Sequence, residues 1–259
     1  MNIKVDPDWW KKIFDEVYLL TDARSVCDEE LTRQEVDLIL EMLPVRPQHK
    51  ILDLCGGHGR HSLELFARGF TGGTMLDYSK YLIDHARSNA EIKNYRIKLI
   101  QRDARDTGLP SESFDHVLIL GNSLGYIAES EADALILQEA KRVLKKKGWI
   151  LIDVTDGSKV EETLTPTAWH EIDADKVVCR QRELVGKRVD ARELVLSKKE
   201  GLIRDSTYSI RIYRPGELAA MMEKAGFKKV RVQNDFRAHK DKGDYGFMNR
   251  RMLAIGRKL

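Results

Sequence analysis

An apolar run, a glycine-rich turn and a helix-like repeat follow one another directly in residues 51–70, ILDLCGGHGRHSLELFARGF. Ile51–Leu54 is short enough to be a buried strand. Leu63 and Phe66 then recur at the spacing of one helix face, and Gly69 is well placed to end that helix. A strand, a glycine turn and a helix N-terminus in this order predict the first unit of a nucleotide-type α/β fold.

The residues of this turn indicate which ligand it favours. Gly57 and Gly59 let the backbone come close to a ligand, and the unpaired amides at the helix start point toward it. A dinucleotide fingerprint would have its third glycine where Ser62 stands. Asp53, at the strand end, would repel a pyrophosphate. Its carboxylate suits a ligand with positive charge, such as the sulfonium and ammonium of S-adenosylmethionine (SAM).

Further strands with polar ends follow in order. The apolar segment 74–76 ends in Asp77, where an acid can accept hydrogen bonds from ribose hydroxyls, of SAM or of NAD alike. A third strand, 97–100, runs into Asp103-Ala104. A fourth strand, 114–120, and a fifth, 149–154, complete the series.

Asp53–Gly59 resembles motif I of the class I SAM-dependent methyltransferases, D-x-G-x-G-x-G, with Cys55 in place of the first glycine, which stiffens the loop slightly. Order, spacing and residue type agree with that family over residues 45–155. The resemblance implies an α/β, Rossmann-like, mostly parallel sheet of seven strands in the order 3-2-1-4-5-7-6, with an inserted antiparallel lid. It also implies SAM as the cofactor and S-adenosylhomocysteine (SAH) as its product.

The resemblance implies a cofactor site in which Asp103 meets the adenine amino group and the next backbone amide meets a ring nitrogen. Asp6-Pro7 predicts the start of an N-terminal helix, which either packs on the domain or caps the cofactor with Tyr18. Trp9 and Trp10 cannot both face one way on a helix, so one of them could face the substrate cavity or a partner. The residues expected to bind SAM are Tyr18, Asp53, Cys55, Gly57, Gly59, Asp77, Tyr78, Asp103, Ala104, Leu120 and Asn122.

Four parts are expected along the chain. They are an N-terminal helical cap (1–44), a SAM-binding core (45–156), an antiparallel insertion (157–213), and the last helix with an edge hairpin (214–259). In the first, Thr32–Glu35 reads as a capping box that starts a helix. In the second, the helix at Glu131–Leu144 is expected to end in three lysines, 145–147, and Gly148. Alternating side chains in the insertion predict about four antiparallel strands, which form a lid over the substrate or the surface of a homodimer.

The acceptor is expected near Gly121–Tyr126, after the fourth strand. The Asn/Asp-Pro-Pro-aromatic tetrad of many base and glutamine methyltransferases is absent there. The segment GNSLGY instead resembles enzymes that act mostly on small molecules, including sugar and amino-acid N-methyltransferases. Candidates for substrate contact are Asn122, Tyr126, His170, Tyr208 and Arg211, with Arg180, Arg182 and Tyr213 as further polar or aromatic residues of the insertion and Tyr245 and Phe247 in the last loop. About half of those in the insertion should face away from any site.

No catalytic side chain is assigned, because methyl transfer from a sulfonium needs alignment and exclusion of water more than acid or base help. His61, Tyr126 and His170 are candidates for a base, which helps when the acceptor is a phenol or a protonated amine. The expected function is methyl transfer to N or O of a small molecule. The alternatives are an RNA or protein methyltransferase, which would need a basic face or an added recognition domain, and a SAM-binding protein without catalysis.

Composition sets a few limits. The net charge of +3 by itself argues neither for nor against a polyanionic partner. Nucleic acid is not expected as a partner, because the sequence shows neither a basic face nor an added recognition domain. There is no run of about 18 apolar residues and no signal peptide, so no membrane association is expected. Three widely spaced cysteines, Cys27, Cys55 and Cys179, are typical of reduced thiols in a cytoplasmic protein, and no Cys/His cluster has metal-ligand spacing.

Overall fold

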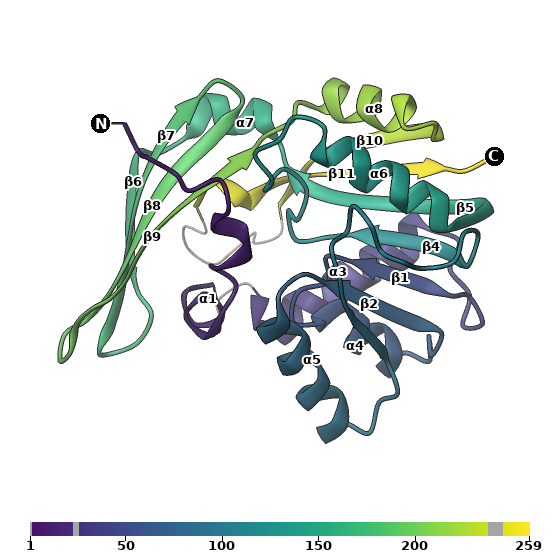
Figure 1. The fold of residues 1–259 in the computed structure, drawn as a ribbon, viewed down its shortest axis with the longest axis horizontal. Helices are drawn as coiled ribbons and strands as arrows, with labels where there is room; N and C mark the ends of the chain where they lie inside the picture. The colour runs from purple at the N-terminus through teal and green to yellow at the C-terminus, as the bar shows by residue number, and fades with distance from the viewer. Residues whose placement is uncertain (1, 23–25, 238–245) are drawn as a thin grey trace.

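The computed structural model describes residues 2–22, 26–237 and 246–259. They form a seven-stranded sheet with helices on both faces and a separate four-stranded sheet (Figure 1). The N-terminal segment, drawn in purple, lies between the two sheets. In the described part of the chain, no helix is both long and apolar enough to span a bilayer.

The large sheet has the order β10-β11-β5-β4-β1-β2-β3, which confirms the predicted 3-2-1-4-5-7-6 order with β11 and β10 as the seventh and sixth strands. β1 to β5 run parallel, whereas β11 is antiparallel to β5 and to β10. Because the parallel strands share one carboxyl edge, the loops that follow β1, β2 and β4 meet there. The strands are β1 Ile51–Leu54, β2 Gly73–Asp77, β3 Lys98–Gln101, β4 Phe114–Ile119, β5 Leu144–Thr155, β10 Lys228–Arg237 and β11 Arg250–Arg257.

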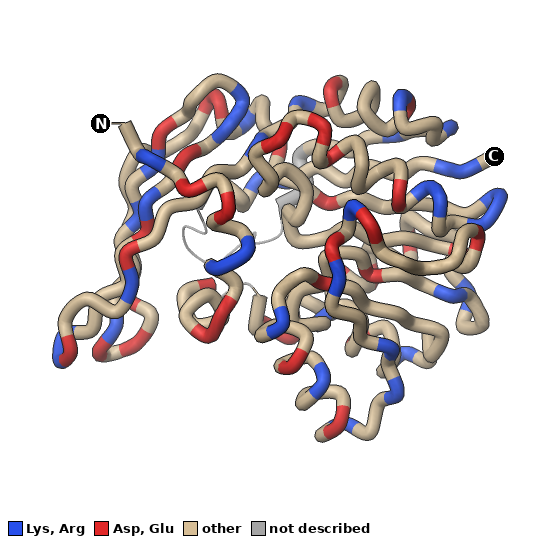
Figure 2. Tube along the Cα trace, viewed as in Figure 1, with Lys and Arg blue, Asp and Glu red and all other residues tan. Residues whose placement is uncertain are grey.

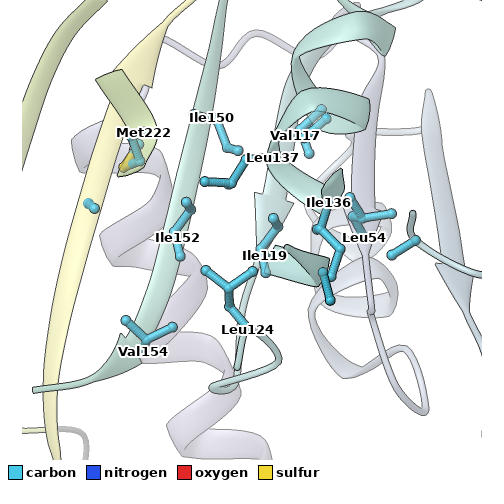
Figure 3. Close-up of a cluster of buried hydrophobic side chains, with 14 of the residues drawn as sticks. Leu54, Val117, Ile119, Leu124, Ile136, Leu137, Ile150, Ile152, Val154 and Met222 are labelled. Carbon is cyan, nitrogen blue, oxygen red and sulfur yellow. The ribbon is translucent and has the colours of Figure 1, made fainter. Parts of the chain in front are cut away.

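Alternating side chains of the large sheet build two apolar layers. Val117 and Ile150 pack with Leu137 on one face (Figure 3). Leu118 and Leu151, one residue further along each strand, pack with Val36 on the other face. The helices are α3 Glu29–Met42, α4 Arg60–Ala67, α5 Lys80–Ile92, α6 Ala132–Val143 and α8 Pro215–Lys224.

The second sheet is the predicted antiparallel insertion, in the order β6-β7-β8-β9. Helix α7, Gly157–Thr163, leads from β5 into it. Its strands are β6 Thr167–Glu171, β7 Lys176–Val185, β8 Arg188–Ser197 and β9 Gly201–Arg211. The division of the chain at residues 44, 156 and 213 stays a prediction.

The predicted N-terminal helix from Asp6-Pro7 is wrong. Trp9–Lys11 forms one 3₁₀ turn, η1, and a separate short helix, α1, covers Glu16–Thr21. The chain breaks because the carboxylate of Asp15 accepts the N–H groups of Val17 and Tyr18, both at 3.0 Å, and so starts a new helix. The Ser79 hydroxyl also donates to the carbonyl of Phe14 at 2.8 Å, which ties the segment to the core.

Two further helix ends differ from expectation. α3 begins at Glu29, because Asp28 rather than Thr32 accepts the capping N–H, that of Leu31, at 3.0 Å. The lysines 145–147 do not end α6 but lie in β5. The strand starts earlier because Leu144 pairs with Phe114 of β4, and Lys145 reaches the carboxylate of Asp115 at 2.8 Å. The N–H of Lys147 also donates to the carbonyl of Lys258 at 2.8 Å.

A buried carboxylate joins the second sheet to the core. Asp133, at 1% exposure on α6, accepts the N–H of Gly125 at 2.9 Å and receives close contacts from the Arg211 guanidinium and the Tyr213 hydroxyl. Arg188 donates to the carbonyl oxygens of Gly125 and Tyr126 at 3.2 and 3.3 Å. The loop after β4 is therefore fixed to the second sheet from both sides.

Asp133→Asn should lower the free energy of unfolding by about 3 kcal/mol, because it leaves the half-buried Arg211 without a counter-ion. Asp205→Asn is the matched control, since its Arg192 partner is exposed, and it should cost less than about 1 kcal/mol. Urea unfolding followed by circular dichroism measures both values. Equal losses in the two variants would contradict the role given to Asp133.

Candidate functional site

A cavity lies at the carboxyl edge of the large sheet, which we call the strand-end cavity. Its walls come from the loops after β1, β2, β3 and β4, from the N-terminal segment with η1 and α1, and from the N-terminal turns of α5 and α6. Seven of the residues predicted to bind SAM line it: Tyr18, Cys55, Gly57, Asp77, Tyr78, Asp103 and Ala104. The topology thus brings together side chains that are up to 86 positions apart, from Tyr18 to Ala104.

The glycine turn has three residues in the left-handed region. Cys55, Gly57 and Gly59 have φ angles of 63°, 60° and 83°. A left-handed backbone costs a residue with a Cβ about 1–2 kcal/mol, which explains why glycine suits the position of Cys55. A Cβ on Gly57 would meet only the Leu82 side chain, at 4.0 Å, so this backbone is open toward the cavity.

Gly59 lies in more crowded surroundings than Gly57. A Cβ there would lie 3.0 Å from the sulfur of Met75 and 3.1 Å from the Cβ of Ala86. Gly59 therefore permits close packing between the start of α4, strand β2 and helix α5, and it does not line the strand-end cavity.

The pKa values of two carboxylates in this cavity are shifted in opposite directions. Asp77 accepts the N–H groups of Gly57 and Ser79, both at 2.8 Å, but its burial raises its pKa to about 6. Partial burial acts the same way on Asp103, yet the adjacent Arg105, whose Nη2 lies 2.6 Å away, holds the pKa of Asp103 below its usual value. Asp103 is thus ionised over a wider pH range than Asp77.

Three other predicted cofactor residues are buried outside the lining of the strand-end cavity. Asp53 is 1% exposed and accepts the Ser62 hydroxyl at 2.8 Å, while its Oδ1 has no partner among the described residues. Asn122 accepts the N–H of Thr155 at 2.8 Å and thereby joins the ends of β4 and β5. Leu120 packs in the layer under α3.

A second cavity lies between the two sheets, and we call it the inter-sheet cavity. It is bounded by the N-terminal segment, the inner face of the second sheet, the start of α4 and the end of the large sheet. Phe14, Tyr18, Gly121 and Tyr126 line both cavities. Trp9 lines the inter-sheet cavity and Trp10 the strand-end cavity, so the two tryptophans face two different cavities.

Aromatic rings form the wall between the cavities. Phe14 stacks on Tyr126 with ring centroids 5.6 Å apart and meets Tyr18 edge-on at 5.0 Å. Trp9 lies 5.2 Å from Tyr126 and 5.8 Å from Tyr208. Burial raises the pKa of Tyr126 and of Tyr208 above the usual value, so both phenols are neutral hydrogen-bond donors at neutral pH.

The inter-sheet cavity is rich in buried arginines. Arg180 and Arg182 were among the polar residues singled out in the insertion, whereas Arg60, Arg204 and Arg251 were not. Among the described residues, all of them except Arg182 have an ion-pair partner, and some of these partners are distant in the sequence, as with Arg180 and Asp22, 3.1 Å apart across 158 positions. No local pattern could have identified them, apart from the strand alternation that places Arg180 and Arg182 on one face.

Of the remaining predicted site residues, some line the inter-sheet cavity and others lie outside both cavities. Tyr126 and Tyr208 line the inter-sheet cavity, as does Phe247, while Tyr245 lies outside the described residues. Arg211 holds Asp133 and does not line either cavity. His61 is buried against Glu35 at 2.8 Å, and His170 lies on β6; neither reaches the two cavities. Among the described residues, no cluster of His, Cys, Asp and Glu has the arrangement of a metal site.

Comparison with known proteins gives one family and a consistent fold. Residues 51–148 match the family described as "Methyltransferase domain". The chain is 27% identical over 219 residues to the Bacillus subtilis (strain 168) protein "Putative methyltransferase YqeM", a match that covers 82% of this chain and 87% of that protein.

Two solved structures share the architecture. One is an S-adenosylmethionine-dependent methyltransferase from Clostridium acetobutylicum ATCC 824, with a TM-score of 0.72 and 15% identity over 91% of this chain and 94% of that chain. The other is the 1,6-didemethyltoxoflavin-N1-methyltransferase of Burkholderia thailandensis, bound to 1,6-didemethyltoxoflavin and SAH. It has a TM-score of 0.62 and 17% identity over 100% and 92% of the two chains.

The different surroundings of the two glycines predict different costs of substitution. Gly57→Ala and Gly59→Ala should each lose about 1–2 kcal/mol of unfolding free energy from the left-handed backbone. Gly59→Ala should lose about 1–3 kcal/mol more, because its Cβ meets Met75 and Ala86. Urea unfolding followed by tryptophan fluorescence measures the difference. Equal stabilities would show that Gly59 is not a packing position.

Proposed function

Because the chain belongs to the class I SAM-dependent methyltransferases, we propose that the strand-end cavity binds SAM and that the inter-sheet cavity holds a small-molecule acceptor. The methyl group would be transferred to a nitrogen or oxygen atom of that acceptor. The observation that carries the proposal is the pair of adjoining cavities, which share Phe14, Tyr18, Gly121 and Tyr126 as their common wall.

The lining of the strand-end cavity fits SAM. Gly57 leaves room for the ligand to approach the backbone, and Asp77 has oxygens that would accept the ribose hydroxyls. Asp103 and the amide of Ala104 would receive the adenine edge, beside the rings of Trp10 and Tyr78, whose centroids are 4.7 Å apart. Asp53, behind the turn, would add negative charge near the cationic end of the ligand.

Bound SAM would supply a methyl group on a sulfonium. The sulfur is a good leaving group when a nucleophile approaches the methyl carbon in line. The chain's part is to position the acceptor atom beside Tyr126 and Gly121 and to keep water away. The aromatic rings that line both cavities would exclude water from the place where the cavities meet. Neutral Tyr126 and Tyr208 can donate hydrogen bonds that orient the acceptor. We assign no general base, because His61 and His170 lie outside both cavities.

A small acceptor is favoured over a macromolecule. The inter-sheet cavity is covered by the N-terminal segment and the second sheet, so an acceptor must fit between them. In the view of Figure 2, basic and acidic residues are interspersed over both sheets, unlike the one-sided basic face typical of nucleic-acid binding. The similar Burkholderia thailandensis methyltransferase is bound to 1,6-didemethyltoxoflavin, not to a macromolecule. A homodimer through the second sheet stays a prediction; Trp169 on its edge strand is 70% exposed.

The raised pKa of Asp77 predicts a pH-dependent affinity for SAH. Ribose hydroxyls hydrogen-bond better to the ionised carboxylate, so SAH affinity should rise from pH 5 to pH 7, by up to about tenfold per pH unit below pH 6. Isothermal titration at several pH values measures this. In the absence of ligand, the free energy of unfolding changes with pH in the opposite direction. Because the pKa of Asp77 is raised in the folded protein, Asp77 contributes stability at low pH, and this contribution is lost as the pH rises through 6.

Two variants control that titration. Asp77→Asn should bind SAH more weakly at pH 7 by about 1–3 kcal/mol, since a charged hydrogen-bond acceptor is lost, and its affinity should vary less with pH. Asp84→Asn, at an exposed position on α5, should keep the wild-type profile. A wild-type affinity that is flat between pH 5 and 7 would remove the Asp77 carboxylate from the binding site.

Methyl transfer is tested by SAH release with a panel of small amines, sugars and phenols. With at least one amine or hydroxyl acceptor, the wild-type protein should form and release SAH. Gly57→Val should release none, because the larger side chain fills the strand-end cavity. Binding of SAM with no release for any small acceptor, but release with RNA or a protein, would replace the small-molecule assignment. Binding with no release at all would point to a non-catalytic SAM-binding protein.

A further inference from the structure

The inter-sheet cavity contains one buried arginine that differs from the others. Four arginines of its lining each have a carboxylate partner. Arg60 contacts Glu35, Arg180 and Arg204 both reach Glu193 at 2.7 Å, and Arg251 is bidentate to Asp153, with its Nη2 at 2.7 Å.

Arg182 has no carboxylate partner among the described residues. It is 4% exposed, and its Nε and Nη1 make no hydrogen bond with any of them. Its guanidinium carbon lies 5.7 Å from the centroid of the Phe247 ring.

An unpaired guanidinium in this position is costly. Arginine stays protonated at every pH that a protein survives, so it cannot relieve the cost by losing its proton. Contact with a ring face replaces only a fraction of the hydration that burial removes. The protein therefore keeps at Arg182 a positive charge with unused donors, in a cavity where every other arginine is neutralised.

The position of Arg182 relates this charge to the methyl-transfer path. It lies on β7 on the same strand face as Arg180, and both line the cavity together with Tyr208. Tyr126 and Gly121 lie where this cavity meets the strand-end cavity. A ligand held at Arg182 by one end could thus direct its other end toward the aromatic wall.

We propose that the Arg182 guanidinium binds an anionic group of the methyl acceptor, a carboxylate or a phosphate, within the inter-sheet cavity. The acceptor class is then an amine or alcohol that also carries an oxyanion, whose planar or tetrahedral oxygens match the guanidinium donors. This inference rests on the proposed function, because it names the substrate class of the same site.

The test follows the Nε–H signal of Arg182 by NMR in the ¹⁵N-labelled full-length chain saturated with SAH. Arg182→Met identifies the signal by its loss. Sodium acetate and inorganic phosphate are titrated separately at constant ionic strength. A shift with acetate indicates a site for a carboxylate, and a shift with phosphate indicates a site for a phosphate group. The signal should shift saturably with at least one of them, because the free guanidinium donors gain an acceptor.

Thermal unfolding in the same two salts gives a second readout. The anion that shifts the signal should raise the melting temperature of the wild-type protein, and Arg182→Met should weaken this binding at least tenfold. Arg182→Lys, which keeps the charge with fewer donors, should retain part of it. Arg192→Met is the matched control on the exposed face of the same sheet, paired with Asp205, and it should respond as the wild type does.

The outcomes separate the two proposals. If the wild-type protein binds SAH but the Arg182 signal ignores both anions, or if Arg182→Met binds them as tightly as the wild type, the anion site is wrong and the proposed function stands. If SAH does not bind, the proposed function fails, and the assignment of the anion to a methyl acceptor fails with it.

Discussion

The arrangement of the molecule depends on one desolvated negative charge, that of Asp133. It is held on α6, and it binds the loop after β4 through Gly125 and the second sheet through Arg211 and Tyr213. Burying a charge is favourable only when its partners are fixed, so these contacts are made together or not at all. The position of Tyr126, next in the chain after Gly125, follows from this joint, and Tyr126 forms part of both cavities.

The inner face of the second sheet shows a related principle. This face buries apolar side chains such as Val178 and Ile210, and beside them it presents arginines and Glu193 to the inter-sheet cavity. Their mutual ion pairs keep the cavity polar without leaving most of these charges uncompensated. Such a surface costs stability compared with apolar packing. It gives in return a pocket that distinguishes ligands by charge, which an apolar pocket does poorly.

The large sheet was predicted well because its strands and the glycine turn have local sequence patterns, and the resemblance to the methyltransferase family supplied the strand order. The errors arose where distant groups decide the outcome. Asp15 divides the N-terminal helix, and contacts of Lys145 with Asp115 and of Lys147 with Lys258 hold the lysines 145–147 in β5. In the site, the residues that follow strands β1 to β3 came together as expected. The inter-sheet ion pairs, such as that of Arg204 with Asp15, join segments far apart in the chain and leave no local signature.

The 3₁₀ turn η1 places Trp9 and Trp10 in two different cavities although they are neighbours in the chain. Because the two rings stand on consecutive residues of one turn, the lining of both cavities depends on the position of the same three residues, Trp9–Lys11.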